Sequence, residues 1–279
     1  MAGGTSFYMA HGMHHLSPDF PFQLVTKIGQ ESQEEVDRLR QMNINVLSYS
    51  SRHSVFFENC YGLDSDQRTQ RVLVKADPFT IEEMKPLQAE VFHLGSLLAD
   101  DFSPEIVKYL SQKGRISIDV QGYLREVRGD KVYAVDWKDM DAVLPYVDMI
   151  KLNEHEMRAI MQLNNPKTVA EKLASYGIRE VIITLGSYGS LIYADKTYYE
   201  IPAYPPKKIV DATGCGDTYS TGYLYMRSQG ATFQEAGRFA SAMCTLKLEH
   251  NGPFEGSLKD IETLIKNTDR LSQPARIRF

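Results

Sequence analysis

The sequence predicts a doubly wound α/β fold, in which a mostly parallel sheet is flanked by helices. Two observations support this fold class. Short runs of β-branched and apolar residues alternate with segments of helical period, which is the pattern of parallel strands joined by crossover helices. The expected strands are also continuous apolar runs, as they are when both faces of a sheet are covered. Such sheets bind ligands beyond the carboxyl ends of their strands, so functional residues are expected there.

The expected elements follow the chain in this order. Gly3 and Gly4 lead almost directly into a helix at residues 6–15. Buried strands are expected at residues 22–28, 91–94, 116–120, 147–152 and 180–185. Helices between them are expected at residues 33–41, 104–113, 154–161 and 168–176. After Gly216 the chain is expected to be helical, at residues 218–229, 233–248 and 258–266.

Two stretches depart from this alternation and predict hairpins. Residues 55–63 and 71–75 are consecutive strand-like runs with no helix between them. A lid at about residues 54–76 and an ordinary antiparallel edge share this pattern, so both interpretations stay open. Residues 190–194 and 197–201 predict a second hairpin, which we expect to belong to the framework.

Composition and charge narrow the class of protein. The 279 residues are 43% hydrophobic and 24% charged, as in a globular protein with a sizeable core. The formal net charge of −5 argues against a broad nucleic-acid surface, because such surfaces are basic. The three cysteines, Cys60, Cys215 and Cys244, are far apart and indicate neither a disulfide framework nor a zinc site. No apolar run reaches the roughly 18 residues of a membrane span, so we expect a soluble, cytoplasmic protein without nucleic-acid or membrane partners.

An anion-binding site is predicted at residues 211–217, whose sequence is Asp-Ala-Thr-Gly-Cys-Gly-Asp. Gly214 and Gly216 flank Cys215 at the start of a helix, so successive backbone N–H groups can converge on a phosphate together with the helix dipole. A plain turn with a helix cap is the alternative. The chain has no Gly-Lys dipeptide, which excludes a P-loop, and Tyr219 stands where a dinucleotide fingerprint needs glycine.

Asp217 is the candidate catalytic residue. It is the first acid after the glycines, so its carboxylate is expected beside the anion site, where it can aim an attacking hydroxyl and accept its proton. Cys215 lies at the same helix N-terminus, which predicts a lowered thiol pKa. A buried, inert thiol is the alternative.

Asn153 and Glu156 are candidate metal-binding residues. They follow the strand expected at residues 147–152 and are spaced to share one side of a first helical turn. An acid beside an amide suits Mg²⁺ that keeps most of its own waters. The same spacing is that of a helix capping box, and the two roles can coexist.

Thr184, Gly186 and Gly189 form a glycine-rich exit from the strand expected at residues 180–185. Backbone can approach a nucleotide closely at such an exit. A simple reversal of the chain is the alternative interpretation.

These three segments together resemble the motifs of the ribokinase-like, or PfkB, family of carbohydrate kinases. Residues 211–217 resemble the family's D-T-x-G-A-G-D signature, residues 153–156 its N-x-x-E motif and residues 184–189 its T-L-G-x-x-G nucleotide turn. The resemblance implies a single ribokinase-like kinase domain over residues 1–279, with the hairpin at about 54–76 as a lid. It also implies transfer of the γ-phosphoryl group of ATP to a hydroxymethyl group of a sugar, an inositol-like polyol or a nucleoside.

The resemblance also assigns roles to individual residues. Asp217 is implied to be the base, and the amides of Gly214, Cys215 and Gly216 are implied to hold the transferring phosphoryl group. Asn153 and Glu156 are implied to organise Mg²⁺ and phosphates. The remaining roles are ATP binding by Thr184, Gly186 and Gly189, acceptor binding by Gly3 and Gly4, and a position for Asp211 near a monovalent-cation site such as one for K⁺.

The chain departs from the family pattern at several positions. Tyr8 stands where the family's N-terminal G-G-x-x-x-N motif has asparagine, and the family's opening strand, with its acceptor-binding aspartate, is missing before Gly3. Ala212 and Cys215 replace Thr and Ala in the signature. Arg125, after a central strand, is a further candidate contact to acceptor or phosphate, although most arginines are simply exposed.

Two functional hypotheses therefore remain. The first is a small-molecule kinase, and the second is a ribokinase-like protein that binds a ligand or partner without catalysis. Within the family, the pattern is most similar to inositol-type and nucleoside-type members. Lids in this family often pair between subunits, which implies a homodimer through the lid.

Overall fold

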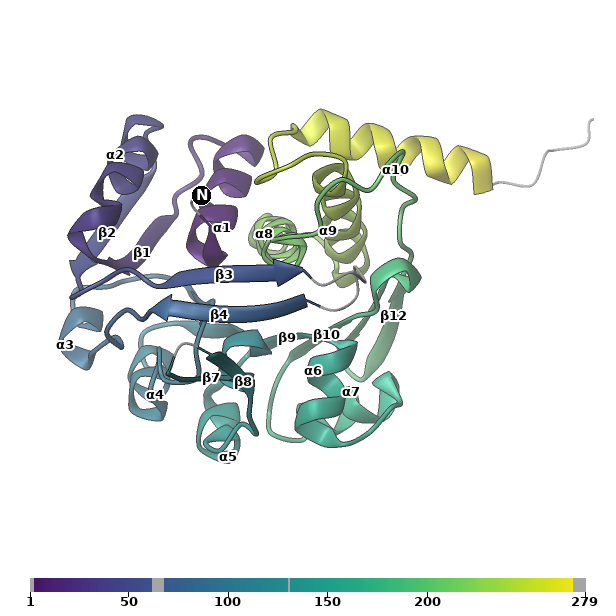
Figure 1. The fold of residues 1–279 in the computed structure, drawn as a ribbon. Coiled ribbons are helices and arrows are strands. Elements are labelled where there is room, and N and C mark those ends of the chain that lie inside the picture. Colours follow the sequence, from purple (N-terminus) through teal and green to yellow (C-terminus); the bar gives the residue numbers. More distant parts are fainter. Residues whose placement is uncertain (1–2, 62–67, 130, 273–279) are drawn as a thin grey trace, which may run out of the picture. The chain divides into compact units, whose positions relative to one another are not determined.

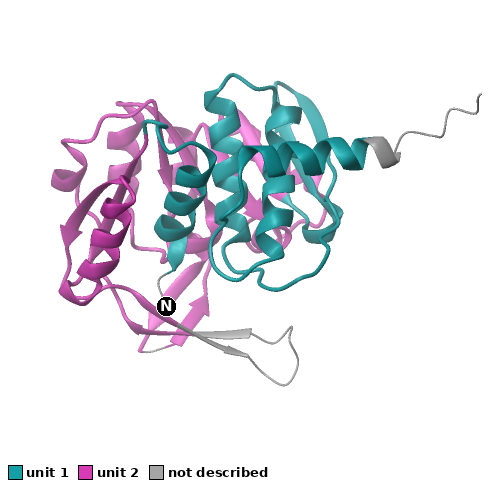
Figure 2. Cartoon of the chain, turned by 90° about the horizontal axis from the view of Figure 1, so that it is seen from above, with its two compact units in different colours: residues 1–21, 184–279 teal, residues 22–183 magenta. Residues whose placement is uncertain are grey.

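The computed structural model describes residues 3–61, 68–129 and 131–272 (Figure 1). The chain divides into two compact units (Figure 2). Unit 1 combines residues 1–21 with residues 184–279, and unit 2 is the continuous segment 22–183.

Unit 2 contains the parallel sheet that the sequence predicts. Its strands are ordered β10-β9-β6-β5, and the β5–β6 and β6–β9 pairs are parallel. The strands are mostly buried because isoleucine, leucine and valine occupy them on both faces. Their bounds are Val91–Leu94 for β5, Arg115–Asp119 for β6, Met149–Asn153 for β9 and Glu180–Thr184 for β10. All four lie within two residues of the predicted ranges.

The helices of unit 2 alternate with its strands along the chain (Figure 1). Helix α6 begins after the N-cap Asn153, and helix α7 begins with a proline after the N-cap Asn165, as the capping preferences of asparagine and proline predict. The bounds are Gln33–Gln41 for α2, Ile81–Met84 for α3, Pro104–Ser111 for α4, Met140–Val143 for α5, Glu154–Met161 for α6 and Pro166–Ala174 for α7.

A separate pair of strands opens unit 2. Strand β1 (Gln23–Ile28) was expected, and it pairs in parallel with β2 (Asn45–Ser50), which the sequence did not predict. Helix α2 provides the crossover between them. Polar residues interrupt β2, and only Val46 in it is buried, so its local sequence carries little strand signal.

The hairpin predicted near residues 54–76 is confirmed. Strand β3 (Phe56–Tyr61) pairs antiparallel with β4 (Arg68–Val74), and residues 62–67 lie outside the described residues. The hairpin belongs to a separate four-stranded antiparallel sheet, ordered β3-β4-β8-β7, with β7 at Arg125–Arg128 and β8 at Lys131–Ala134. It is therefore not an edge of the parallel sheet. Strands β7 and β8 were not predicted.

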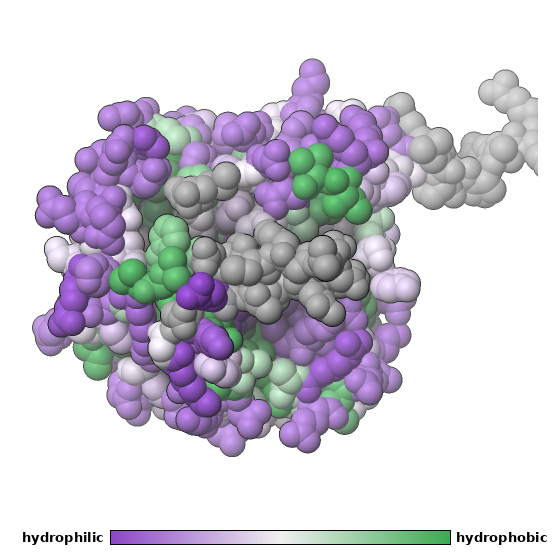
Figure 3. All heavy atoms as spheres, in the orientation of Figure 1, coloured by the Kyte–Doolittle hydropathy of each residue, from purple (hydrophilic) through white to green (hydrophobic). Residues whose placement is uncertain are grey.

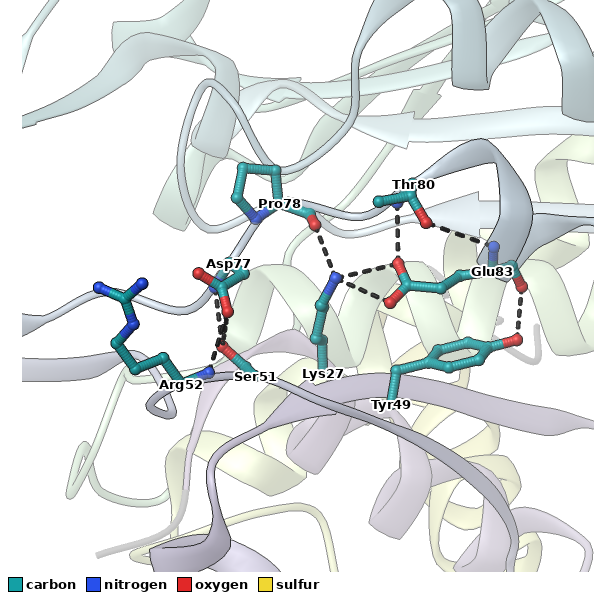
Figure 4. A network of polar contacts seen from close by, with 8 residues as sticks. All are labelled: Lys27, Tyr49, Ser51, Arg52, Asp77, Pro78, Thr80 and Glu83. Carbon is teal, nitrogen blue, oxygen red and sulfur yellow. Dashed lines mark hydrogen bonds and ion pairs between the residues drawn. The ribbon is translucent and has the colours of Figure 1, made fainter.

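A polar network links β1 to the segment that follows β4 (Figure 4). The ammonium of Lys27, on β1, donates to the carbonyl of Pro78 at 2.8 Å and pairs with the carboxylate of Glu83 at 2.8 Å. Glu83 also accepts from the backbone N–H of Thr80 at 2.8 Å. The Lys27 and Glu83 side chains are only 8% and 18% exposed, so loss of one partner would leave a poorly solvated charge.

Asp77 joins the two connections that lead into and out of the hairpin. Its carboxylate accepts from the backbone N–H of Arg52 at 2.9 Å, and its own N–H donates to the hydroxyl of Ser51 at 2.8 Å (Figure 4). Residues 51–52 precede β3 and residue 77 follows β4. These two hydrogen bonds hold together the segments on either side of the hairpin.

Unit 1 consists of helices and one hairpin (Figure 1). Strands β11 and β12 pair antiparallel, as predicted. Their turn residues, Asp195 and Lys196, have φ of 49° and 59°, as a two-residue type I′ turn requires. The bounds are Gly4–Leu16 for α1, Ser190–Ala194 for β11, Thr197–Ile201 for β12, Cys215–Ser228 for α8, Phe233–Leu248 for α9 and Leu258–Ser272 for α10.

Helix α1 packs tightly within unit 1 because of a glycine. A Cβ on Gly12 would lie 3.1 Å from Thr221 Cγ2, on α8, and 3.2 Å from Met243 Cε, on α9. Side chains of α1, α9 and α10 share a buried cluster, formed by Leu16, Tyr204, Phe239, Ala242, Met243, Phe254 and Ile261.

The surface in Figure 3 is mainly hydrophilic. Within the part of the chain that the structure describes, every helix is too short or too polar to cross a bilayer.

Candidate active site

The predicted site residues fall into two groups, one in each unit. Unit 1 holds the segment 211–217, which we call the anion loop, together with the glycines at the start of α1 and the turn that begins at Thr184. Unit 2 holds Asn153, Glu156 and Arg125.

The anion loop presents bare amides at the start of α8. Gly214 is the N-cap of this 14-residue helix. Among the described residues, the N–H groups of Gly214 and Gly216 have no hydrogen-bond acceptor, whereas that of Cys215 donates to the carbonyl of Ala212 at 3.2 Å. Two of the three predicted amides therefore face no competing acceptor, and the helix dipole adds positive potential at the same place.

Position 214 requires a glycine, both for its backbone conformation and for the lack of space around it. Its φ is 76°, in the left-handed region that costs other residues free energy. A Cβ there would lie 2.5 Å from Cγ and Cε1 of Tyr8, which is inside van der Waals contact. Tyr8 lies on α1 and is 5% exposed. Its ring is therefore packed directly against the anion loop.

The two N-terminal glycines begin the helix that carries Tyr8. Gly3 is the N-cap of α1, and Gly4 is its first residue with φ of 80°. Gly4 and Tyr8 are four residues apart, so they share one face of the helix. Helix α1 contacts the anion loop through Tyr8.

Asp217 lies in the first turn of α8, where the dipole favours an acid. Its carbonyl accepts from the hydroxyl of Thr221 at 2.8 Å. Its negative charge acts on the neighbouring Cys215 thiol. The acid thus follows directly after the two bare amides.

The expectation for Cys215 is wrong. Burial raises the pKa of its thiol to about 11, and the positive charge of Lys247 offsets this only in part. The carbonyl of Cys215 accepts from the thiol of Cys244 at 3.2 Å. Desolvation outweighs the helix N-terminus at this position, which favours the alternative of an inert thiol.

Lys247 is the main residue of this group that sequence reasoning missed. It lies on α9, its side chain is 0% exposed, and its ammonium donates to Asp211 at the carbonyl oxygen (2.7 Å) and at Oδ2 (3.0 Å). Partial burial opposes ionisation of Asp211, but hydrogen bonds from Thr213 and Lys247 outweigh it and lower its pKa. A lysine within an apolar helical segment was the signal in the sequence.

The two glycines of the turn after β10 have different structural roles. Gly189 has φ of 92°, and a Cβ on it would clash with the carbonyl of Ile201 and lie 2.8 Å from the N of Ala203. Gly186 has φ of 57° and open space around it. Gly189 thus serves packing, while the backbone at Gly186 can be approached by a ligand.

In unit 2, Asn153 and Glu156 form a capping box. The Glu156 carboxylate accepts from the backbone N–H of Asn153 and from its amide nitrogen, both at 2.8 Å. The Asn153 side-chain oxygen accepts from the N–H groups of His155 (2.8 Å) and Glu156 (2.9 Å). The capping interpretation is therefore confirmed, and the metal role stays a prediction.

Glu156 belongs to a buried charged group that the sequence did not reveal. Asp119 and Lys151 are partners across β6 and β9, and they form an ion pair at 2.6 Å with side chains 8% and 6% exposed. Burial, followed by repulsion from Asp119, raises the pKa of Glu156 to about 7, while Lys151 and Arg125 act in the opposite direction.

This donor set fits Mg²⁺ held through water. A bound cation would stabilise the ionised form of this buried carboxylate, whose pKa is raised. Each Glu156 oxygen also keeps a further lone pair that can accept a hydrogen bond from a metal-bound water. Among the described residues, no group of three or more His, Cys, Asp or Glu side chains is arranged to hold a metal ion directly. Direct coordination by a protein cage is therefore not the mode that these residues fit.

The family model of the pfkB carbohydrate kinases matches residues 10–260. The chain belongs to this family. A pfkB-family member was expected from the motifs at residues 153–156, 184–189 and 211–217, and this expectation is confirmed.

Sequence relatives include a cytidine kinase from Thermococcus kodakarensis, which is 31% identical over 156 residues, covering 54% of this chain and 52% of that protein. The chain spans about half the length of the curated relatives it matches. Among solved structures, a pyrophosphate-dependent myo-inositol-1 kinase converted into a myo-inositol-3 kinase superposes with a TM-score of 0.83 at 23% identity, covering 96% of this chain and 91% of that chain. A Burkholderia thailandensis nucleoside kinase in complex with inosine gives a TM-score of 0.75 at 19% identity, covering 94% and 84%. The structural likenesses establish the ribokinase-like fold of this pfkB-family chain.

Proposed function

We propose that this pfkB-family protein transfers the γ-phosphoryl group of ATP to a hydroxymethyl group of a nucleoside, an inositol-like polyol or a sugar. One observation carries the proposal: two amides without an acceptor among the described residues, and an acid, are concentrated at the N-terminus of α8. An anion site alone binds phosphate, whereas an anion site followed by a carboxylate can also direct an attack on it.

Each part of the anion loop has a role in this proposal. The N–H groups of Gly214 and Gly216 hold the oxygens of the migrating phosphoryl group, where charge accumulates in the transition state. Asp217 orients the acceptor hydroxyl and takes its proton late in the transfer. Cys215 contributes a side chain small enough to leave the phosphoryl group room.

Residues of each unit are assigned to the donor separately. The open backbone at Gly186, next to Thr184, suits close approach of the nucleotide. Asn153 and Glu156 would hold a hydrated Mg²⁺, which neutralises phosphate charge when bound. Gly189 supports this role only indirectly, by shaping the turn.

In unit 1, Gly3 and Gly4 are the residues proposed for acceptor binding. In unit 2, Arg125 is proposed as a contact to acceptor or phosphate, and the β3–β4 hairpin as a lid. The names of the relatives support nucleosides and inositols as the first compounds to test. Tyr8 argues against a typical sugar acceptor, because it stands where the motif of typical sugar kinases has an amide that holds sugar hydroxyls.

A panel of nucleosides, inositols and sugars with Mg·ATP, followed by ADP release, tests the proposal. Asp217→Asn should reduce phosphoryl transfer by about 10²–10⁴-fold and leave nucleotide affinity nearly unchanged, because the lost interaction belongs to the transition state. Asp260→Asn is the matched control, since Asp260 also lies in the first turn of a helix in unit 1. It should leave turnover at the wild-type level.

The outcomes separate the two hypotheses. Turnover in the wild type that Asp217→Asn does not reduce would contradict the assignment of the base. Absence of transfer across the whole panel at high protein concentration, with ligand binding retained, would favour the non-catalytic binder. Pyrophosphate is included as a second donor, and activity with it alone would replace ATP in the proposal.

A further inference from the structure

We infer that Lys247 acts as a built-in monovalent cation for the anion loop, so that phosphoryl transfer does not depend on K⁺. Lys247 would then be a positioning residue, acting through Asp211 rather than touching the substrate. The predicted effects on turnover rest on the proposed function. The presence of a cation site filled by Lys247 can be tested by protein stability, without any substrate.

The first argument is the burial of the ammonium. The Lys247 side chain is 0% exposed, and an ammonium removed from water is costly unless other groups replace its hydration. Here a carbonyl oxygen and a carboxylate oxygen of Asp211 lie 2.7 Å and 3.0 Å from Nζ, and the Tyr8 ring centroid lies 5.9 Å away. Oxygens and an aromatic face are the surroundings that a single positive charge prefers.

The second argument is the way Asp211 is tied to the loop. Its other carboxylate oxygen, Oδ1, accepts from the N–H of Thr213 at 2.9 Å. The backbone N–H groups of Val210 (2.8 Å) and Asp211 (3.3 Å) both donate to the carbonyl of Leu248, the residue after Lys247. The end of α9 therefore fixes the entrance of the anion loop through main chain and side chain together.

The third argument is electrostatic. The positive charge of Lys247 reaches the Cys215 thiol, where it opposes the effect of burial on the pKa. Cys215 is the first residue of α8, between the two bare amides. A charge felt at this place also stabilises a phosphoryl group held there.

A separate K⁺ at Asp211 does not fit this arrangement. Both oxygens that would coordinate it already bind the ammonium, and a second cation would be repelled by the charge of Lys247. The implied monovalent-cation site is therefore filled by a side chain of the chain itself.

The wild-type protein gives the first test. Its turnover and melting temperature should be the same in KCl, NaCl and choline chloride at equal ionic strength, which keeps general screening constant. Activation by K⁺ of roughly tenfold or more would overturn the inference, because couplings of that size mark a real cation site.

Two substitutions give the second test. Lys247→Ala removes the charge and leaves space, so turnover should fall by about 10²-fold through misplacement of the loop and should recover in part with added ammonium, methylammonium or K⁺. Lys247→Met removes the charge but fills the space, so the same cations should not restore it. Lys266→Ala is the control, since Lys266 is an exposed lysine of the same unit.

Melting temperature keeps the inference testable if no substrate is found. Ammonium or K⁺, compared with choline, should raise the melting temperature of Lys247→Ala but not that of the wild type or of Lys247→Met, because a ligand stabilises only the state with a site for it. Absence of this selective shift, or wild-type turnover in Lys247→Met, would overturn the inference. Failure of the substrate panel alone would instead count against the proposed function.

Discussion

Replacing Gly214 by alanine tests the packing of the anion loop against Tyr8. The new Cβ would lie 2.5 Å from Cγ and Cε1 of a tyrosine ring that is only 5% exposed. The ring cannot turn away easily, because Phe7 contacts it edge-on at 5.7 Å between centroids and the Lys247 ammonium lies on another side, 5.9 Å from its centroid. Either the loop or α1 must therefore move.

Two costs add up in this variant. A left-handed φ costs an alanine about 1–2 kcal/mol, and forced repacking of a filled site costs about 1–3 kcal/mol. The free energy of unfolding should therefore fall by about 2–5 kcal/mol in total. Gly230→Ala separates the two costs, because Gly230 has φ of 79° and an added Cβ there would meet nothing within 4 Å, so only the first applies.

Urea unfolding of Gly214→Ala, Gly230→Ala, Tyr8→Ala and the double variant of Tyr8 and Gly214 measures these costs. Gly214→Ala should be less stable than Gly230→Ala, and the double variant Tyr8→Ala with Gly214→Ala should show a favourable coupling of about 1–3 kcal/mol. Equal losses in Gly214→Ala and Gly230→Ala, together with zero coupling to Tyr8, would refute the contact between α1 and the loop.

Three further predictions concern buried titratable groups. Burial raises the pKa of Glu156 from 4.5 to about 7. The folded state therefore holds this proton more tightly, and the stability of the wild type relative to Glu156→Gln should fall by roughly 3 kcal/mol between pH 5 and 8, at about 1.4 kcal/mol per pKa unit. Urea unfolding free energies of the two proteins that change in parallel with pH would contradict this. Burial lowers the pKa of His93 from 6.5 to about 4, so wild-type stability should fall from pH 6.5 to 4 relative to His93→Leu, by a similar amount, and an unchanged acid limb would count against it. Cys215, with a pKa of about 11, should react with iodoacetamide at pH 8 on the order of 100-fold more slowly than a thiol of pKa 9; peptide mass spectrometry measures this, and fast labelling would reject the buried thiol.

Local signals predicted most of the framework. Helix α9 was expected at its observed bounds from its helical period, and the structure shows in addition a capping box formed by Thr232 and Glu235. The parallel strands were recognisable from apolar runs that only burial on both faces explains. The turn at Asp195 and Lys196 was likewise marked by its residues and length.

The elements that were missed depend on partners far away in the sequence. Strand β2 has one buried residue and is fixed by its pairing with β1. Strands β7 and β8 carry charged residues and are fixed by their neighbours in the four-stranded sheet. Strand preference depends on such context more than helix preference does.

The candidate site also has a part that local sequence predicted and a part that depends on distant residues. The anion loop was predicted because glycines, a small residue and an acid stand next to each other. The partners of its first residue, Asp211, and of Gly214 were not predicted, because Lys247 and Tyr8 come from other helices. Cys215 shows the consequence most directly: the sequence revealed its place at a helix N-terminus but not the burial that reverses the direction of its pKa shift.

The order in which residues are translated has different consequences for the folding of the two units. Unit 2 is one continuous segment, so its sheet can form as it leaves the ribosome. Helix α1 precedes unit 2 in the sequence, whereas its partners Thr221 and Met243 follow unit 2. The buried side of α1, which includes Met13 and Leu16, can therefore be covered by these partners only after residues 22–183 have been translated. The anion loop, which packs against Tyr8 of α1, likewise takes its final shape only when the two separate segments of unit 1 meet.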